Sequence, residues 1–152
     1  MRRRGTEVAI RIGYARWRRT GLAARVGEAV RLGLETRPGA GSVTVLLTSD
    51  ARLRALNATF RGRNKPTNVL SFAAGEPGYL GDVAIAYGVA RAEAARGKKP
   101  LAHHAAHLAL HGTLHLLGYD HETARQAKVM ETLETKLLSR MGIADPYRAE
   151  AG

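Results

Sequence analysis

The residues with the clearest chemical meaning are three histidines in the stretch "HGTLHLLGYDH": His111, His115 and His121. Residues four apart on a helix lie one above the other, so His111 and His115 project from the same face at a separation suited to one metal ion. Gly118 can adopt the left-handed conformation that ends a helix and turns the chain back, which would bring His121 to the same ion. Three imidazoles leave a coordination position open, and an ion held in this way lowers the pKa of bound water to about 7. The spacing therefore predicts a catalytic metal site rather than a structural one.

The residue after the first histidine, Gly112, bears on the type of reaction. Zinc peptidases with the same HxxxHxxGxxH spacing carry a glutamate at that position, and this glutamate deprotonates the water. Glycine cannot accept a proton, so a peptidase built on this chain would need another base. A zinc metallopeptidase-like hydrolase is therefore kept as an alternative rather than as the first interpretation.

The charge of the chain indicates the class of partner. The 152 residues include 24 Lys plus Arg against 13 Asp plus Glu, a formal net charge of +11. Such a surface favours a polyanionic partner, with nucleic acid as the first candidate. Aromatic residues are only 5% of the chain, so few base-stacking platforms are expected, which favours recognition of single-strandedness over recognition of sequence.

The absence of cysteine and of a long apolar segment limits the possible chemistry and the expected cellular compartment. The chain has no cysteine, which excludes disulfides, thiol nucleophiles and cysteine-ligated metals, so a metal must be held by His, Asp or Glu. No segment approaches the length of a membrane span, and no apolar block of signal-peptide length follows the basic N-terminus. We therefore expect a cytoplasmic protein without a membrane partner.

A second candidate group lies in the basic stretch "FRGRNKPTNVLSF", which carries Arg61, Arg63 and Lys65. Guanidinium groups suit bidentate contacts with phosphate, and an arginine directed at a scissile phosphate stabilises the charge that develops there. Arg61 is predicted to be catalytic, and all three residues are candidates for RNA binding. Taken singly, Arg63 and Lys65 are better explained as cations of a solvated surface loop.

Other residues are candidates for supporting the site. Asp82 and Asp120 could orient a ligand histidine or take up a proton, although Asp120 fits a turn residue equally well. Ser71 is a candidate for the cleft wall, and an ordinary strand residue is the alternative. His107, four residues before His111, is expected to lie behind the ligands or to pack.

Hydrophobic periodicity predicts the elements that position these residues. Strands are expected at residues 7–12, 42–48, 68–72 and 80–87, and helices at residues 22–34, 50–60, 89–96, 101–117 and 123–141. The helix at 101–117 is rich in Ala and Leu and is expected to be central and largely buried. Leu53, Leu56 and Phe60 are expected to share one helix face, and His103 and His104 to be solvated.

The predicted fold is therefore α+β: a single domain over residues 1–152, with a mixed sheet of roughly four strands covered by four to five helices. The central helix carries the metal ligands. Residues 1–5 and 148–152 are expected to be flexible ends.

Five motifs in sequence resemble the YbeY family of metal-dependent endoribonucleases. They are "LNATFRGRNKPTNVLSF", "LGDVAIA", "HGTLHLLGYDH", "METLE" and "GIADPY", which together cover residues 56–147. Departures from the family pattern are Ala73 where "SFP" is usual, Phe60 where tyrosine is common, and a short loop before Gly81. The first fifty or so residues match only in their strand–helix–strand order.

The resemblance implies a single-strand-specific endoribonuclease that acts in ribosomal RNA processing, at the 3′ end of small-subunit 16S rRNA, and in ribosome quality control. The three histidines His111, His115 and His121 match the family's ligands for one metal ion, usually zinc, and Arg61 matches its functionally important arginine. Partners would be single-stranded RNA, ribosomal RNA, and the ribosome or small-subunit proteins, with no DNA expected. The attacking group is open between water and the RNA's own 2′-OH. A ribosome assembly factor with a structural metal site is the remaining alternative.

Overall fold

A computed structural model describes residues 7–61 and 67–147 of the chain. Arg63, Lys65 and the two ends predicted to be flexible lie outside the described residues. Of Arg61, only the helical backbone is described.

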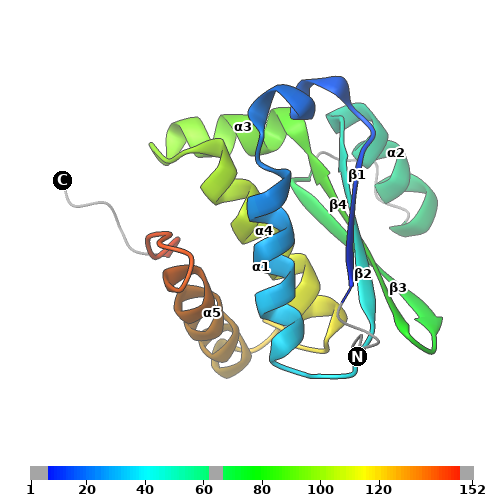
Figure 1. Ribbon diagram of the computed structural model, residues 1–152, viewed down its shortest axis with the longest axis vertical. Coiled ribbons are helices and arrows are strands. Elements are labelled where there is room, and N and C mark those ends of the chain that lie inside the picture. The colour runs from blue at the N-terminus through cyan, green and yellow to red at the C-terminus, as the bar shows by residue number, and fades with distance from the viewer. Residues whose placement is uncertain (1–6, 62–66, 148–152) are drawn as a thin grey trace.

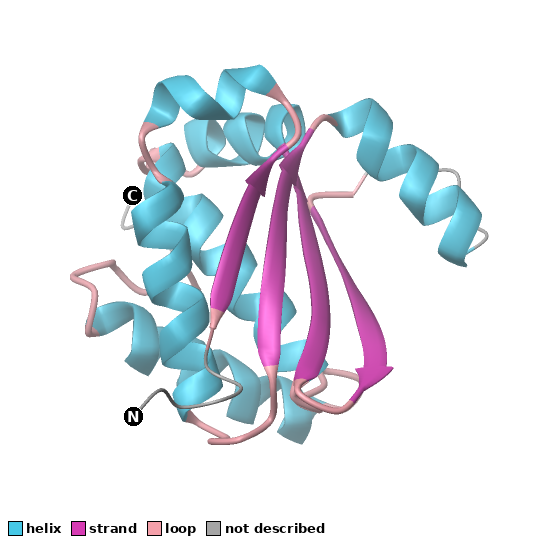
Figure 2. Ribbon diagram, turned by 45° about the vertical axis from the view of Figure 1, so that its right-hand side comes forward, coloured by secondary structure: helices cyan, strands magenta, loops and turns pink. Residues whose placement is uncertain are grey.

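Four strands form one mixed sheet, as predicted (Figure 2). They are β1 (Val8–Ile12), β2 (Ser42–Thr48), β3 (Val69–Glu76) and β4 (Tyr79–Ala86), in the order β1-β2-β4-β3. β2 is parallel to both β1 and β4, whereas β3 is antiparallel to β4. β3 is longer than expected because the chain keeps pairing as far as Glu76 opposite Tyr79. Between β3 and β4 the chain makes a tight turn that includes Gly78, at a φ of 81°.

Helices cover both faces of this sheet. The described residues form a short 3-10 helix η1 (Ala15–Thr20) and the helices α1 (Ala23–Glu35), α2 (Asp50–Arg61), α3 (Tyr87–Arg96), α4 (Leu101–Leu116) and α5 (Ala124–Ser139). α1 and α4 lie on one face, α5 packs outside them, and α2 lies on the other face (Figure 1). This arrangement confirms the predicted α+β class. No helix in the described ranges is both long and apolar enough to cross a membrane.

Helix α4 lies at the centre of the main core. The strands present Val43, Val45, Leu47, Val83 and Ile85 to one face of the sheet, because side chains alternate along a strand, and α1 and α4 cover that face. From the other side, α1 approaches α4 at Gly33, where an added Cβ would lie 3.0 Å from Leu110 and 3.2 Å from Thr113. Packing on two sides explains why the alanine- and leucine-rich sequence predicted a buried central helix.

Two further features were not predicted from the sequence. On α2, Leu53 is buried but Phe60 is 66% exposed, because only the first part of the helix covers the sheet; the Phe60 ring contacts the edge of Phe72 on β3. The helix η1 was not predicted, since six residues rich in arginine give no clear period. It is held by Trp17, which is buried and donates from Nε1 to the carbonyl oxygen of Thr48 at 2.9 Å.

Candidate metal centre

The end of α4 has the geometry that its glycine predicts. Gly118 adopts a φ of 101°, and its N–H donates to the carbonyl oxygen of His115 at 3.0 Å. The N–H of Tyr119 donates to the carbonyl oxygen of Leu114, also at 3.0 Å. These two bonds form a Schellman motif, which ends the helix and turns the chain back over its last turn. The turn carries His121 toward the two histidines of the helix.

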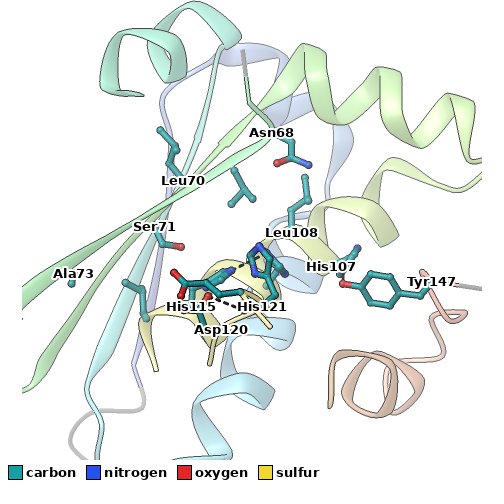
Figure 3. Close-up of a pocket in the computed structure, with 14 residues that line it drawn as sticks. Asn68, Leu70, Ser71, Ala73, His107, Leu108, His115, Asp120, His121 and Tyr147 are labelled. Carbon is teal, nitrogen blue, oxygen red and sulfur yellow. Dashed lines mark hydrogen bonds between the residues drawn. The ribbon is translucent and has the colours of Figure 1, made fainter. Parts of the chain in front are cut away.

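The three histidines meet near the end of α4. Figure 3 shows two of them, His115 and His121, beside the cleft. The Nε2 atoms of His111 and His115 are 3.1 Å apart, and the ring of His121 is centred 5.7 Å and 4.8 Å from the rings of His111 and His115. One nitrogen from each residue lies within 4.8 Å of the others. Nitrogens bound to one tetrahedral zinc ion at about 2.0–2.1 Å would be about 3.3 Å apart. The donor set therefore fits one ion, with a small inward movement of the exposed His121.

The surroundings of His115 favour the form of imidazole that binds metals. Burial lowers its pKa, and the neighbouring His111 and His121 lower it further because like charges repel. Neutral imidazole is the metal-binding form, so this ligand stays available below the pH at which an ordinary histidine takes up a proton.

The three histidines open into a cleft of about 800 Å³. The lining residues include Val69, Leu70, Ser71 and Ala73 of β3, Asn68 just before that strand, and, beyond α4, Asp120, His121, Glu122 and Tyr147. A cleft of this size holds a ligand as large as a nucleotide unit beside the histidines.

Gly112 faces the sheet and not the cleft. A Cβ atom there would lie 2.7 Å from Cγ1 of Val83 and 2.9 Å from Oγ of Ser71, both closer than real Cβ contacts. The missing peptidase glutamate therefore has a packing cause: at this position α4 lies so close to β3 and β4 that no side chain fits. The glycine at position 112 is thus accounted for by the contact between helix and sheet, and not by the type of reaction.

A buried glutamate on α5, Glu134, lies directly behind His111. Its side chain is fully buried, and its Oε2 atom is 2.7 Å from Nδ1 of His111 and 3.6 Å from Nε2 of His107. Tyr147 donates from its hydroxyl to the other carboxylate oxygen, Oε1. Burial opposes the charge on Glu134, but the hydrogen bonds from His107 and His111 outweigh it and lower the pKa of the carboxyl to about 2.

Neither Glu134 nor Tyr147 was predicted as a site residue, although they lie within the motifs "METLE" and "GIADPY". A usable signal was present, because Glu134 lies four residues after Met130 and three before Leu137, on the apolar stripe of a helix. A charged residue at such a position is buried and needs partners.

The other candidate residues are placed as follows. Asp120 lines the cleft, and its Oδ1 atom accepts the N–H of His121 at 2.7 Å. Ser71 also lines the cleft and donates from Oγ to the carbonyl oxygen of Gly112 at 2.9 Å. His107 lies beside Tyr147, with 3.2 Å between its Nε2 and the hydroxyl oxygen (Figure 3).

Asp82 is not brought to the metal centre. Its neighbour on β4, Val83, faces α4, so alternation along the strand turns Asp82 to the opposite face, beside its cross-strand partner Phe72. There it accepts a hydrogen bond from the hydroxyl of Tyr79.

His104 is buried rather than solvated. Its Nε2 atom lies 2.8 Å from Oε1 of Glu93 on α3, and the same carboxylate accepts from the side-chain amide of Asn68 at 3.1 Å. His103, also expected to be solvated, is half-buried, with its Nε2 3.5 Å from Nη2 of Arg25. The prediction that the first turn of α4 is exposed to solvent was wrong, because α1 and α3 cover it.

Comparisons with known proteins identify the family of this chain. Residues 16–142 match the family model described as "Endoribonuclease YbeY". A relative of that name from Rhodopseudomonas palustris is 52% identical over 120 residues, which cover 74% of this chain and 63% of the relative. Another of that name, from Bradyrhizobium diazoefficiens, is 53% identical over 120 residues, covering 72% of this chain and 66% of the relative. The chain thus spans slightly less than two thirds of the length of these two relatives.

The fold has a solved counterpart as well. The solution structure of a protein from Thermotoga maritima superposes with a TM-score of 0.62 at 22% sequence identity and covers 94% of this chain and 100% of that one. The family model and the identity of about one half to the curated relatives establish the family. This chain belongs to the YbeY family.

Proposed function

We propose that this protein is a metal-dependent endoribonuclease that cleaves single-stranded RNA. The observation that carries the proposal is the convergence of His111, His115 and His121 at the floor of an open cleft, in a chain of the YbeY family. The more specific role follows the family resemblance: processing of ribosomal RNA, at the 3′ end of small-subunit 16S rRNA, and ribosome quality control. The proposed partners are ribosomal RNA and the ribosome or small-subunit proteins, and the proposed place of action is the cytoplasm.

In this proposal the three histidines hold one divalent metal ion, and their nitrogen donors suit zinc. When bound, the ion supplies Lewis-acid chemistry: it lowers the pKa of water and stabilises negative charge on a phosphoryl oxygen. Asp120 holds the backbone of His121 through the 2.7 Å bond, so the loop presents its ligand in a fixed orientation. The wall formed by β3 would guide the RNA strand past the histidines.

Arg61 is proposed to bind the scissile phosphate. Support comes from the path of the chain: α2 ends at Arg61, and the chain re-enters the described part just before Asn68, which lines the cleft. The contact between Phe60 and Phe72, with ring centres 5.5 Å apart, fixes the end of α2 against β3, an edge strand whose other face lines the cleft. Arg63 and Lys65 are proposed to add contacts with the RNA backbone, which would make binding sensitive to salt.

The peptidase alternative gains no support from the geometry. The position that carries the base in those enzymes is Gly112, which has no room for a side chain. The positive charge of +11 favours a polyanionic substrate over peptides as a class.

The test compares substrates under one set of conditions. Purified protein is incubated with a single-stranded RNA, its duplex, the same strand as DNA, and an unfolded protein, each with and without a chelator. Single-stranded RNA alone should be cleaved, and chelation or His115→Ala should abolish cleavage. His103→Ala is the matched control, because His103 lies on the same helix outside the metal centre.

Two outcomes contradict the proposal. If RNA cleavage survives both the chelator and His115→Ala, the metal centre has no part in the reaction. If the unfolded protein is hydrolysed in a metal-dependent way, the peptidase interpretation is correct instead. A substrate with a single 2′-deoxy nucleotide at the cleavage point distinguishes the attacking groups, because only attack by the 2′-OH is blocked there.

A further inference from the structure

We propose that Glu134 and Tyr147 are positioning residues for the metal centre. Glu134 fixes the tautomer and orientation of His111, and Tyr147 holds Glu134 in place from the C-terminal segment, residues 140–147, which follows α5. The inference rests on the metal centre of the proposed function and adds to it residues of α5 and of the segment that follows.

The first step is the environment of Glu134. Its side chain is fully buried between α4, α5 and the C-terminal segment, where a carboxylate has little access to water. A buried charge is retained only when it is paired and hydrogen-bonded. His111, His107 and Tyr147 surround it, so the carboxylate has partners on two elements other than its own helix.

The second step assigns donors and acceptors. An ionised carboxylate only accepts hydrogen bonds, so in the 2.7 Å contact Nδ1 of His111 carries the proton. A neutral imidazole has one N–H, so Nε2 of His111 is then left with its lone pair. That atom is the one that lies 3.1 Å from Nε2 of His115. Glu134 thereby selects the tautomer that can bind the ion. Its negative charge also makes the Nε2 lone pair of His111 a stronger ligand for the metal.

The third step concerns Tyr147, which reaches Glu134 from beyond α5. Its N–H donates to Oδ1 of Asp145 at 2.8 Å, and the hydroxyl of Thr135 on α5 donates to the same oxygen at 3.1 Å. Its ring meets that of His107 edge to face, with centres 5.5 Å apart (Figure 3). The tyrosine is thus fixed at both ends, and its hydroxyl fixes the carboxylate. Docking of the C-terminal segment therefore supports the ligand His111.

A second ion is the competing explanation, since His107, His111 and Glu134 also offer three ligand atoms close together. The contact between Nδ1 of His111 and Oε2 of Glu134 argues against it. Two ligand atoms of one tetrahedral ion at about 2.0–2.2 Å lie about 3.3–3.6 Å apart. The observed 2.7 Å is the length of a charge-assisted hydrogen bond.

The test measures zinc affinity by competition with a chromophoric chelator, together with the number of ions bound per chain. Glu134→Gln should weaken zinc binding by about 10- to 100-fold, and Tyr147→Phe by about tenfold, near the lower end of the range for such supporting residues. Glu93→Gln and Tyr79→Phe are matched controls: each alters a carboxylate contact of the same type elsewhere in the chain, and both should bind zinc as the unmodified protein does. Nitrogen NMR of the metal-free protein should show His111 protonated at Nδ1.

The outcomes are separable. If the unmodified protein binds one ion and both variants bind it equally tightly, the inference is wrong and the metal centre stands. If the unmodified protein binds no ion, the proposed function fails and the inference fails with it. If it binds two ions and Glu134→Gln removes one, Glu134 is a ligand and not a positioning residue. If Glu134→Gln fails to fold, the zinc affinity of Tyr147→Phe tests the inference by itself, because this variant changes only a partly exposed side chain.

Discussion

The hydroxyl of Ser71 donates a 2.9 Å hydrogen bond to the carbonyl oxygen of Gly112, and this bond joins the wall of the cleft to the helix that carries His111 and His115, two of the proposed metal ligands. The contact is possible because Gly112 has no side chain: a Cβ atom would lie 2.9 Å from the same hydroxyl. The residue that distinguishes this chain from the zinc peptidases is therefore a packing requirement of the fold.

The first prediction concerns this contact. Gly112→Ala should destabilise the protein by about 1–3 kcal/mol, the usual cost of overpacking, although alanine favours helix. Gly27→Ala is the matched control on α1, because its Cβ would meet only the flexible end of Arg31, at 3.4 Å. It should be neutral or stabilising by up to about 1 kcal/mol. Urea unfolding measures both, and equal effects would contradict the packing argument.

A second prediction concerns the turn that carries His121. Gly118 has a φ of 101°, and nothing lies within 4 Å of an added Cβ, so a substitution there meets only backbone strain. Gly118→Ala should cost about 1–2 kcal/mol and weaken metal binding, whereas Gly118→Asn should cost less because asparagine tolerates this region better. Urea unfolding and zinc titration of the two variants measure these effects. Equal stability and equal zinc affinity of the alanine and asparagine variants would contradict the argument.

The third prediction is a pH dependence. The carboxyl of Glu134 has a pKa of about 2, below its ordinary 4.5, because hydrogen bonds from His107 and His111 outweigh the opposing effect of burial. A group with a lowered pKa in the folded state contributes stability that is complete above the unfolded value and is lost as the pH falls toward the folded value. The difference in unfolding free energy between the metal-free protein and Glu134→Gln should therefore shrink as the pH falls from 4.5 toward 2. A constant difference would mean that Glu134 is not held as a carboxylate.

The fourth prediction separates phosphate binding from metal binding. Arg61→Ala should lower the rate of RNA cleavage by about 100-fold or more, the usual cost of removing a group that stabilises charge in the transition state, with zinc content unchanged. Arg61→Lys keeps the charge but loses the bidentate geometry, so it should restore only part of the rate. Arg54→Ala, an exposed arginine on the same helix, is the control and should leave the rate unchanged. Loss of zinc in Arg61→Ala would assign the arginine a structural role.

Local patterns were sufficient for most of the helices and strands, and for the convergence of the three histidines. A helix, a glycine and a return of the chain are all encoded within eleven residues, so the spacing of His111, His115 and His121 could be interpreted without knowledge of the tertiary structure. The strand at residues 42–48 was equally clear, because β-branched and apolar residues fill it and both its ends match β2.

Tertiary contacts decided the remaining features. Glu134 contacts His111 from 23 residues away in the chain, and Tyr147 contacts Glu134 from 13 residues further on. Local sequence patterns do not predict such long-range contacts. His104 was misjudged because its partner Glu93 lies on another helix. Asp82 was a reasonable candidate by residue type. Its neighbour Val83 faces α4, so the alternation of side chains along β4 points Asp82 away from the cleft.

The most direct test of the central claim, that the three histidines hold a metal ion that RNA cleavage requires, is a titration of the metal-free protein with zinc. Cleavage of a single-stranded RNA is followed as zinc is added. We predict that activity rises from background and saturates at about one ion per chain, and that His115→Ala shows neither binding nor recovery. Full activity in the metal-free protein, or recovery in His115→Ala equal to that of the unmodified protein, would contradict the account.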